Sequence, residues 1–169
     1  DYPQNASREL SIAIFDIAPT QADKNAAKAR VLDLVEDKQV YNKTAKANET
    51  VSGFKSTTDV GGYVNMYSDA SFDTTYYAEG QLSPAIEAEM RTAELGFVFG
   101  PYEENNSFKI ARLNDRRNDS VQVAIIEIAM EASEETANEI YAQASEMAAA
   151  KDAVSFEAMA DEKNVALTT

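Results

Sequence analysis

The sequence predicts an α+β fold in which helices pack a small antiparallel sheet and a second strand-helix-helix unit follows. First, the stretch ELGFVFGPYEENNSFKIARL at residues 94–113 has two apolar runs around a polar turn at Asn105 and Asn106, which is typical of a β-hairpin. Second, residues 10–18 and 121–129 are similar β-branched runs of strand length. Third, an amphipathic helical pattern follows each of these runs.

The two β-branched runs align without a gap, since IAIFDIA at 12–18 matches VAIIEIA at 123–129. Both are apolar enough to predict a strand that is covered on both faces. Thr20 and Ser133 precede the two helical patterns, and acids in the following turn favour a helix start there. The apolar stripes predicted for these helices are Ala22, Ala26, Ala29, Leu32 and Val35, and Ala137, Ile140, Tyr141, Ala144 and Ala148. The chain therefore contains a duplicated strand-helix unit.

The segments between and after the two copies have simpler signals. Residues 42–62 are rich in Thr, Lys, Asn and Gly and are predicted to form a loop. Ser83 and Pro84 are a typical cap and first position of a short helix through Met90 and Ala93. One more short helix is predicted from Ser155. Its inward residues are Phe156, Met159 and Ala160.

The polar run NDRRND at 114–119 predicts a domain boundary just before the second copy. It divides the chain into a first domain at 8–114 and a partial second unit at 120–169, which either stands alone or contributes to a shared core.

Composition excludes several classes of function. The net charge of −14 leaves no basic footprint for nucleic acid. With no cysteine and no histidine, disulfides, the usual zinc or copper sites and Ser-His or Cys-His nucleophiles are excluded. The acid pairs lack the pattern of a calcium loop, so neither a metal nor a cofactor is predicted. No apolar run approaches the ~18 residues of a membrane helix.

The order of these segments resembles the parvulin-type peptidyl-prolyl isomerases. That family has a stretch of the form Asp-Leu-Gly-Trp-Phe-x-x-Gly-Gln-Met-x-Pro-x-Phe-Glu, and this chain reads DTTYYAEGQLSPAIE at 73–87. The hairpin at 94–113 is similar to the family's Gly-x-Val-x-Gly-Pro hairpin, and YSD at 67–69 resembles its Tyr-Ser-Asp. The whole layout looks most like periplasmic foldases of the PpiD and SurA type.

The resemblance implies a site that has lost its catalytic residues. The family's first-strand histidine would fall near Ile14 in the first copy and near Ile125 in the second, and its hairpin histidine near Lys109. An ammonium group cannot replace a neutral imidazole, because it donates hydrogen bonds but does not accept them. No catalytic residue is therefore expected. The residues that the resemblance implies for substrate binding are Asp73, Tyr76, Tyr77, Ile86 and Met90.

The function implied by the resemblance is that of a non-catalytic, peptide-binding chaperone region of a periplasmic peptidyl-prolyl cis-trans isomerase, with a role in protein folding and outer-membrane protein biogenesis. Its expected partners are unfolded or extended polypeptide clients. The expected location is the periplasm, with a tether to the inner membrane through a segment outside this chain.

Two other interpretations stay open. The repeated strands could pair between chains in a structural or assembly module, which predicts a homo-oligomer. A histidine-free pocket with residual isomerase activity is the other. Among the candidate site residues, Tyr76 and Tyr77 are also typical core aromatics, and Asp73 is also a typical turn or cap residue.

Overall fold

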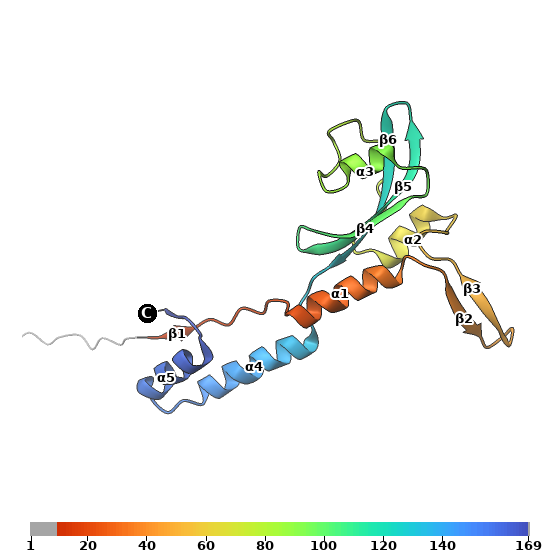
Figure 1. Ribbon diagram of the computed structural model, residues 1–169. Helices are drawn as coiled ribbons and strands as arrows, with labels where there is room; N and C mark the ends of the chain where they lie inside the picture. Colours follow the sequence, from red (N-terminus) through yellow and green to blue (C-terminus); the bar gives the residue numbers. More distant parts are fainter. Residues whose placement is uncertain (1–9, 169) are drawn as a thin grey trace, which may run out of the picture. The chain divides into compact units, whose positions relative to one another are not determined.

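The computed structural model describes residues 10–168, which fall into two units (Figure 1). We call Gln21–Met130 the sheet unit. The described parts of Asp1–Thr20 and Glu131–Thr169 together form the helical unit. The chain leaves the helical unit after Thr20 and returns to it at Glu131, so the sheet unit is an insertion within it.

The sheet unit is built around a three-stranded antiparallel sheet in the order β4-β5-β6. A separate two-stranded hairpin, β2-β3, extends away from this sheet (Figure 1). The elements are α1 (Gln21–Asp33), β2 (Lys38–Asn42), β3 (Ala47–Val51), α2 (Val60–Tyr67), α3 (Glu87–Thr92), β4 (Val98–Glu104), β5 (Ser107–Arg117) and β6 (Ser120–Ala129). Mixed α and β structure with small antiparallel sheets is compatible with the predicted α+β class.

The predicted hairpin is confirmed, and Asn105 and Asn106 form its turn with φ of 52° and 58°. Asparagine is one of the few residues that adopt this left-handed conformation readily. The polar run 114–119, where the sequence predicts a domain boundary, instead forms the end of β5 and a tight turn into β6. Arg117 pairs with Ser120 across this turn, and Asn118 has a φ of 50°. The division between units therefore falls elsewhere, because β6 completes the sheet that β4 and β5 begin.

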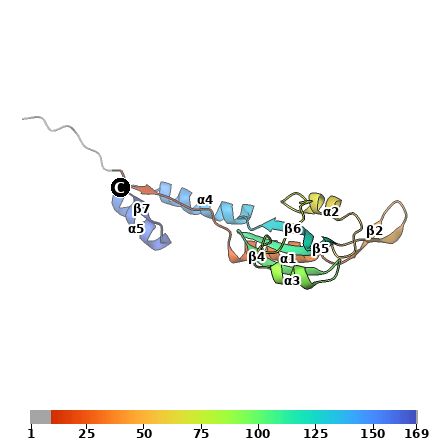
Figure 2. The same ribbon diagram turned by 90° about the horizontal axis from the view of Figure 1, so that it is seen from above.

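Both faces of the sheet are covered, as the sequence predicts for the second β-branched run. Alternate residues of β6 point to opposite faces. Ala124, Ile126 and Ile128 are buried in one cluster with residues of α1 and α2, whereas Val121 and Val123 are buried in another with Ile86 and Met90. Figure 2 shows α2 and α3 on opposite sides of the sheet.

Helix α1 is confirmed, but of its predicted stripe only Val35, just beyond the end of the helix, packs against the core. Ala22, Ala26, Ala29 and Leu32 are exposed, whereas the face that packs on the sheet carries Ala27 and Val31, with Leu34 and Val35 half-buried. Alanine occurs both on the exposed face of this helix and at the buried Ala27. Alanine buries little area, so the apolar face is defined by Val31 and Leu34 and not by alanine spacing.

The segment 42–62, predicted as a loop, contains strand β3 and the start of α2. Asn42 accepts hydrogen bonds from the backbone amides of Thr44 (2.8 Å) and Ala45 (3.1 Å), which closes the turn between β2 and β3. Val40 and Tyr41 are exposed on this hairpin. The side chains of this hairpin do not pack against the core. Its sequence is therefore polar and has no alternating apolar residues, which is also the pattern of a loop.

The short helix predicted from Ser83 begins later, at Glu87, because Ile86 is its N-cap residue. Ser83 does act as a local cap, since its hydroxyl accepts from the amide of Ala85 at 3.3 Å. Met90 is fully buried in this helix. The Ser-Pro signal therefore marks a turn that leads into the helix and does not mark its first residue.

The helical unit contains β1 (Ile12–Ala13), α4 (Glu134–Ala148), α5 (Ala153–Lys163) and β7 (Leu167–Thr168), with β1 antiparallel to β7. Ser133 caps α4 by accepting from the amide of Thr136, as predicted. In α5, Ala160 is buried and Phe156 and Met159 are half-buried, which confirms the inward residues predicted there. In the α4 stripe, Ala137, Ile140 and Ala144 are half-buried, but Tyr141 and Ala148 are exposed and Met147 is the buried residue. No helix in the described range is long and apolar enough to cross a membrane.

The first β-branched run differs most from its prediction. Only Ile12 and Ala13 are in a strand, and Leu10, Ile12, Ile14 and Ile17 are exposed, so this run is not covered on both faces. The duplicated strand-helix unit is also divided between the two units. The strand of the first copy and the helix of the second lie in the helical unit, whereas the helix of the first copy and the strand of the second lie in the sheet unit.

Candidate functional site

A cavity of ≈ 240 Å³ lies in the sheet unit beside the two longest strands. Lys109 on β5 lines it together with Val123, Ile125 and Glu127 on β6. Residues two apart on a strand point to the same face, which places these three β6 side chains together. The volume is below the ~300–1,000 Å³ typical of small-molecule sites, so the cavity is suited to one or two side chains.

The other lining residues of the cavity come from the segment that precedes α3. Asp73, Tyr77 and Ile86, three of the predicted binding residues, line the cavity. The other two do not. Tyr76 donates its hydroxyl to Asp115 at 2.5 Å, and its ring lies 4.2 Å from the guanidinium of Arg117. Met90 is fully buried in the core cluster under the sheet. The paired aromatics of the motif therefore face different surroundings, because neighbouring residues in extended chain point in opposite directions.

An ion cluster surrounds Lys109. Its Nζ lies 3.1 Å from Oε2 of Glu104 and 3.2 Å from Oε2 of Glu127, and its side chain is 10% exposed. Ser83 donates to Glu104, and Ser107 donates to Oε1 of Glu127 at 2.9 Å. Both carboxylates are thereby held in place by a hydroxyl on one side and an ammonium on the other.

These contacts shift the protonation equilibria of the cluster. Burial alone would lower the pKa of Lys109, but its hydrogen bonds and ion pairs with Glu104 and Glu127 outweigh burial and raise that pKa. The hydrogen bond from Ser83, supported by Lys109, holds the pKa of Glu104 below its ordinary value. Lys109 is therefore a permanent cation and cannot act as a general base at neutral pH.

Tyr102 on β4 faces Lys109 across the hairpin. Its hydroxyl is buried and has no hydrogen-bond partner among the described residues. Burial, together with the nearby charges of Glu104 and Glu127, raises its pKa well above the ordinary value for tyrosine. A neutral phenol therefore lies beside the ion cluster.

Asp73 and Tyr77 form a second polar pair in the lining. The Tyr77 hydroxyl donates to Asp73, which also accepts from the backbone amide of Thr75 at 2.8 Å. Hydrogen bonds from Thr75 and Tyr77 lower the pKa of Asp73, and the bond to Asp73 raises the pKa of Tyr77. Asp73 is thus an ionised acceptor, and it is at the same time the turn residue that its sequence position also predicts.

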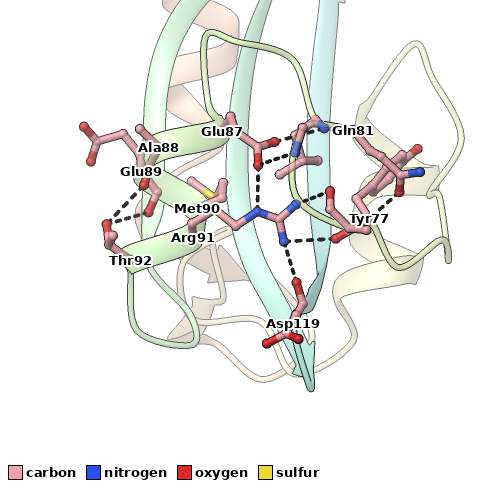
Figure 3. A network of polar contacts seen from close by, with 12 residues as sticks. Tyr77, Gln81, Glu87, Ala88, Glu89, Met90, Arg91, Thr92 and Asp119 are labelled. Atoms are coloured by element: carbon pink, nitrogen blue, oxygen red, sulfur yellow. Dashed lines mark hydrogen bonds and ion pairs between the residues drawn. The ribbon is translucent and has the colours of Figure 1, made fainter.

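Arg91 on α3 fixes the backbone of the segment that carries the motif (Figure 3). Its Nε lies 2.7 Å from Glu87, and its other nitrogens donate to the carbonyl oxygens of Tyr77, Ala78 and Asp119. Glu87 in turn accepts from the amides of Gly80 (3.1 Å) and Leu82 (3.0 Å). The matched motif therefore has a structural basis here, because Glu87 and Arg91 close the turn that presents Tyr77 and Ile86 to the cavity.

Of the three positions that the resemblance associates with histidine, two line this cavity, and they come from different parts of the chain. Lys109 comes from the hairpin, and Ile125 comes from the strand of the second copy. Ile14, the matching residue of the first copy, belongs to the helical unit. Sequence reasoning missed Glu104, Glu127 and Arg91. Cross-strand pairing of Lys109 with Glu127 was the available signal for one of them, but it required the register of β5 and β6.

The chemistry available in the cavity is recognition through charge, hydrogen bonds and an apolar wall. In the described part of the chain no group of His, Cys, Asp or Glu residues could hold a metal ion. Fold and site together define a mixed α/β protein with small antiparallel sheets and a cavity of side-chain size. Comparison with protein families, curated proteins and solved structures finds no match.

Proposed function

We propose that this chain is a non-catalytic, peptide-binding chaperone region of a periplasmic peptidyl-prolyl cis-trans isomerase, with a parvulin-like sheet unit. One observation carries the proposal. Lys109 and Ile125, which stand where the resemblance implies histidines, line a single cavity with Asp73, Tyr77 and Ile86. The hairpin, the second β-branched run and the 73–87 motif, which one resemblance relates to the same family, thus all contribute to a cavity that is large enough for a side chain such as the ring of proline.

Binding without catalysis follows from the groups that are present. Rotation about a prolyl bond has a barrier of ~20 kcal/mol, and positioned polar groups typically contribute a factor of about 10² to 10⁴ in rate. Lys109 already pairs with two carboxylates, and the position of the second histidine is the aliphatic Ile125. A proline ring can rest against Ile86, Val123 and Ile125, but no free imidazole faces its amide.

Two measurements with the whole chain test this proposal. In a protease-coupled assay on a succinyl-Ala-Ala-Pro-Phe anilide, isomerisation should proceed at the spontaneous rate. In ¹H–¹⁵N correlation spectra, the same anilide should shift the amides of Tyr77, Lys109 and Ile125. Turnover well above the spontaneous rate would refute the non-catalytic assignment, and absent shifts would refute peptide binding at this cavity.

A matched pair of variants separates the cavity from the general surface. Ser71 is exposed and lines the cavity, so Ser71→Tyr should fill its mouth and weaken binding about tenfold without disturbing the core. Met66 is 72% exposed on α2 and does not line the cavity, so Met66→Tyr should leave binding unchanged. Equal effects of the two substitutions would contradict the proposed location.

The alternative function, assembly through the repeated strands, has less support at β6. Its outer edge already bonds to other parts of the sheet unit: Tyr77 and Val121 exchange two backbone hydrogen bonds (2.8 and 3.0 Å), and the amide of Asp69 donates to Glu127 at 2.9 Å. A strand whose edge is occupied in this way does not recruit a second chain. The first β-branched run lacks such cover.

A further inference from the structure

The first β-branched run exposes a row of three apolar side chains. Leu10, Ile12 and Ile14 alternate along the chain and are 70%, 49% and 62% exposed. The residues between them are half-buried, and Ser11 lines a cavity with Met147 and Phe156 of the two helices. One side of the run therefore packs on the helical unit. The other side is a row of three branched apolar residues exposed to water, of which Ile12 lies in β1, and exposed apolar patches mark interaction sites.

The second copy shows how the same side chains are covered elsewhere in this molecule. Leu10 and Ile12 align with Val121 and Val123, which are 0% and 3% exposed. Those two residues pack against the apolar cluster of Leu82, Ile86 and Met90. They also belong to a strand that pairs along ten residues with its neighbour β5. Residues of this pattern are thus buried in this chain by a neighbouring strand and an apolar layer.

The backbone of the first run is free to accept a neighbour. β1 and β7 form a two-stranded sheet that pairs only Ile12 with Thr168 and Ala13 with Leu167. Within the described residues, the other edge of β1 faces no strand. An unpaired edge beside an exposed apolar row is the arrangement to which extended polypeptides add by β-augmentation.

Charge indicates which polypeptide fits this surface. The described residues of the helical unit, 10–20 and 131–168, carry ten acidic residues and two lysines, a net charge of −8. A second copy of the chain would bring the same negative charge to the interface and be repelled, whereas a basic segment would be attracted.

We propose that residues 10–17 are a binding edge for an extended polypeptide segment of a partner protein, with alternating apolar side chains and flanking lysine or arginine residues, which adds to β1 as a neighbouring strand. This surface extends the proposed polypeptide binding to the helical unit. Its residues are separate from the cavity residues, so each proposal can fail without the other.

The test uses the whole chain and a labelled peptide of about ten residues, in which valine and threonine alternate between two lysines at each end. Fluorescence anisotropy should show saturable binding that weakens as salt rises from about 50 to 500 mM. A peptide with glutamates in place of the lysines should bind at least about tenfold more weakly. Ile12→Asp should lower affinity for the lysine peptide by about tenfold or more, because it places a carboxylate in the apolar row.

Two further variants decide whether a strand is added at this edge. Ile14→Pro removes the backbone N–H of this residue, a hydrogen-bond donor, and should weaken binding even though the residue stays apolar. Val154, 77% exposed in the same unit, is the control, and Val154→Asp should leave affinity unchanged. Circular dichroism should show the same helix content in all three variants, because each site is exposed.

Three results would overturn the proposal. The first is equal binding of the lysine and glutamate peptides. The second is an Ile12→Asp effect no larger than that of Val154→Asp. The third is light scattering that shows a wild-type dimer dispersed by Ile12→Asp, because a second copy would then cover this row. The Ser71→Tyr variant should bind the lysine peptide normally, which distinguishes failure of this proposal from failure at the cavity.

Discussion

Replacing Lys109 by methionine removes the ammonium that lies between Glu104 and Glu127 while keeping an unbranched side chain that is only one atom shorter. In the wild-type protein its Nζ is 3.1 and 3.2 Å from the two carboxylates, and Lys109 comes from the middle of the sheet. In the variant, two negative charges would face each other beside the buried Tyr102 hydroxyl. The folded state loses two attractions and gains one repulsion.

The magnitude follows from the exposure of the three side chains. Breaking a fully buried ion pair costs about 3–5 kcal/mol, and an exposed pair contributes about 0–1 kcal/mol. The Lys109 side chain is 10% exposed, and those of Glu104 and Glu127 are 28% and 27% exposed, which places the cluster between these limits. We expect Lys109→Met to lower the free energy of unfolding by about 2–3 kcal/mol at pH 7.

The directions of the pKa shifts determine the pH range in which the ion cluster stabilises the folded state. The pKa of Glu104 is lowered in the folded state, so its contribution is present above its unfolded pKa of about 4.3 and is lost as pH falls. The pKa of Lys109 is raised, so its contribution is present below about pH 10.4 and is lost as pH rises through the folded pKa. The difference between wild type and variant should thus be widest from about pH 5 to 10.

Urea unfolding followed by far-UV circular dichroism at pH 7 and at about pH 3.5 measures this difference. Lys55→Met is the control, since the Lys55–Glu36 pair is 61% and 72% exposed and its loss should cost no more than about 0.5 kcal/mol. A Lys109→Met effect as small as the control at pH 7, or one of equal size at both pH values, would refute the reasoning.

Two further predictions concern the turn before α3 and two glycines with positive φ. Arg91→Met removes the ion pair with Glu87 and the hydrogen bond to the Tyr77 carbonyl. The amides of residues 77–82 should therefore exchange with deuterium at least about tenfold faster, while those of β5 stay protected. Unchanged exchange would show that Arg91 does not hold this turn. Gly100 has a φ of 122°, and a Cβ there would lie 2.8 Å from a backbone oxygen of β5, so Gly100→Ala should cost at least about 2 kcal/mol in urea unfolding. Gly80→Ala, at a φ of 79° with open space around it, should cost only about 1 kcal/mol, and equal costs would refute the role of the contact.

The elements that could be predicted from the sequence are those with local signals. The hairpin is specified by Asn105 and Asn106, which accept a left-handed turn, and by apolar residues on both sides. Helix α4 is specified by the cap at Ser133 and by acids in its first turn. Helix α5 is predicted from Ser155, and its capping box, formed by Asp152 and Ser155, starts the helix slightly earlier, at Ala153. Such signals act between residues that are close in the sequence, so they do not depend on how the rest of the chain folds.

The elements that could not be predicted depend on partners far along the chain. The hairpin β2-β3 buries almost nothing, so its sequence has no alternating apolar face to reveal it. The two β-branched runs are alike in sequence, yet one is the third strand of a sheet and the other pairs through two residues. The neighbour with which a strand pairs depends on chain connectivity and on the other strands available, as well as on the strand's own residues.

The strand of the second copy lies in the sheet unit with the helix of the first copy. This division explains why residues of the candidate site could be predicted from the sequence, whereas the strands that bring them together could not. A strand from the second copy supplies Ile125 to the cavity and, two residues on, the carboxylate of Glu127 to Lys109. A bound peptide carbonyl would have to compete for the Lys109 ammonium against two charge-assisted contacts, which are roughly twice as strong as neutral ones. The strand that completes the cavity thus also keeps its cation occupied, and this favours a site that holds a peptide over one that polarises its amide.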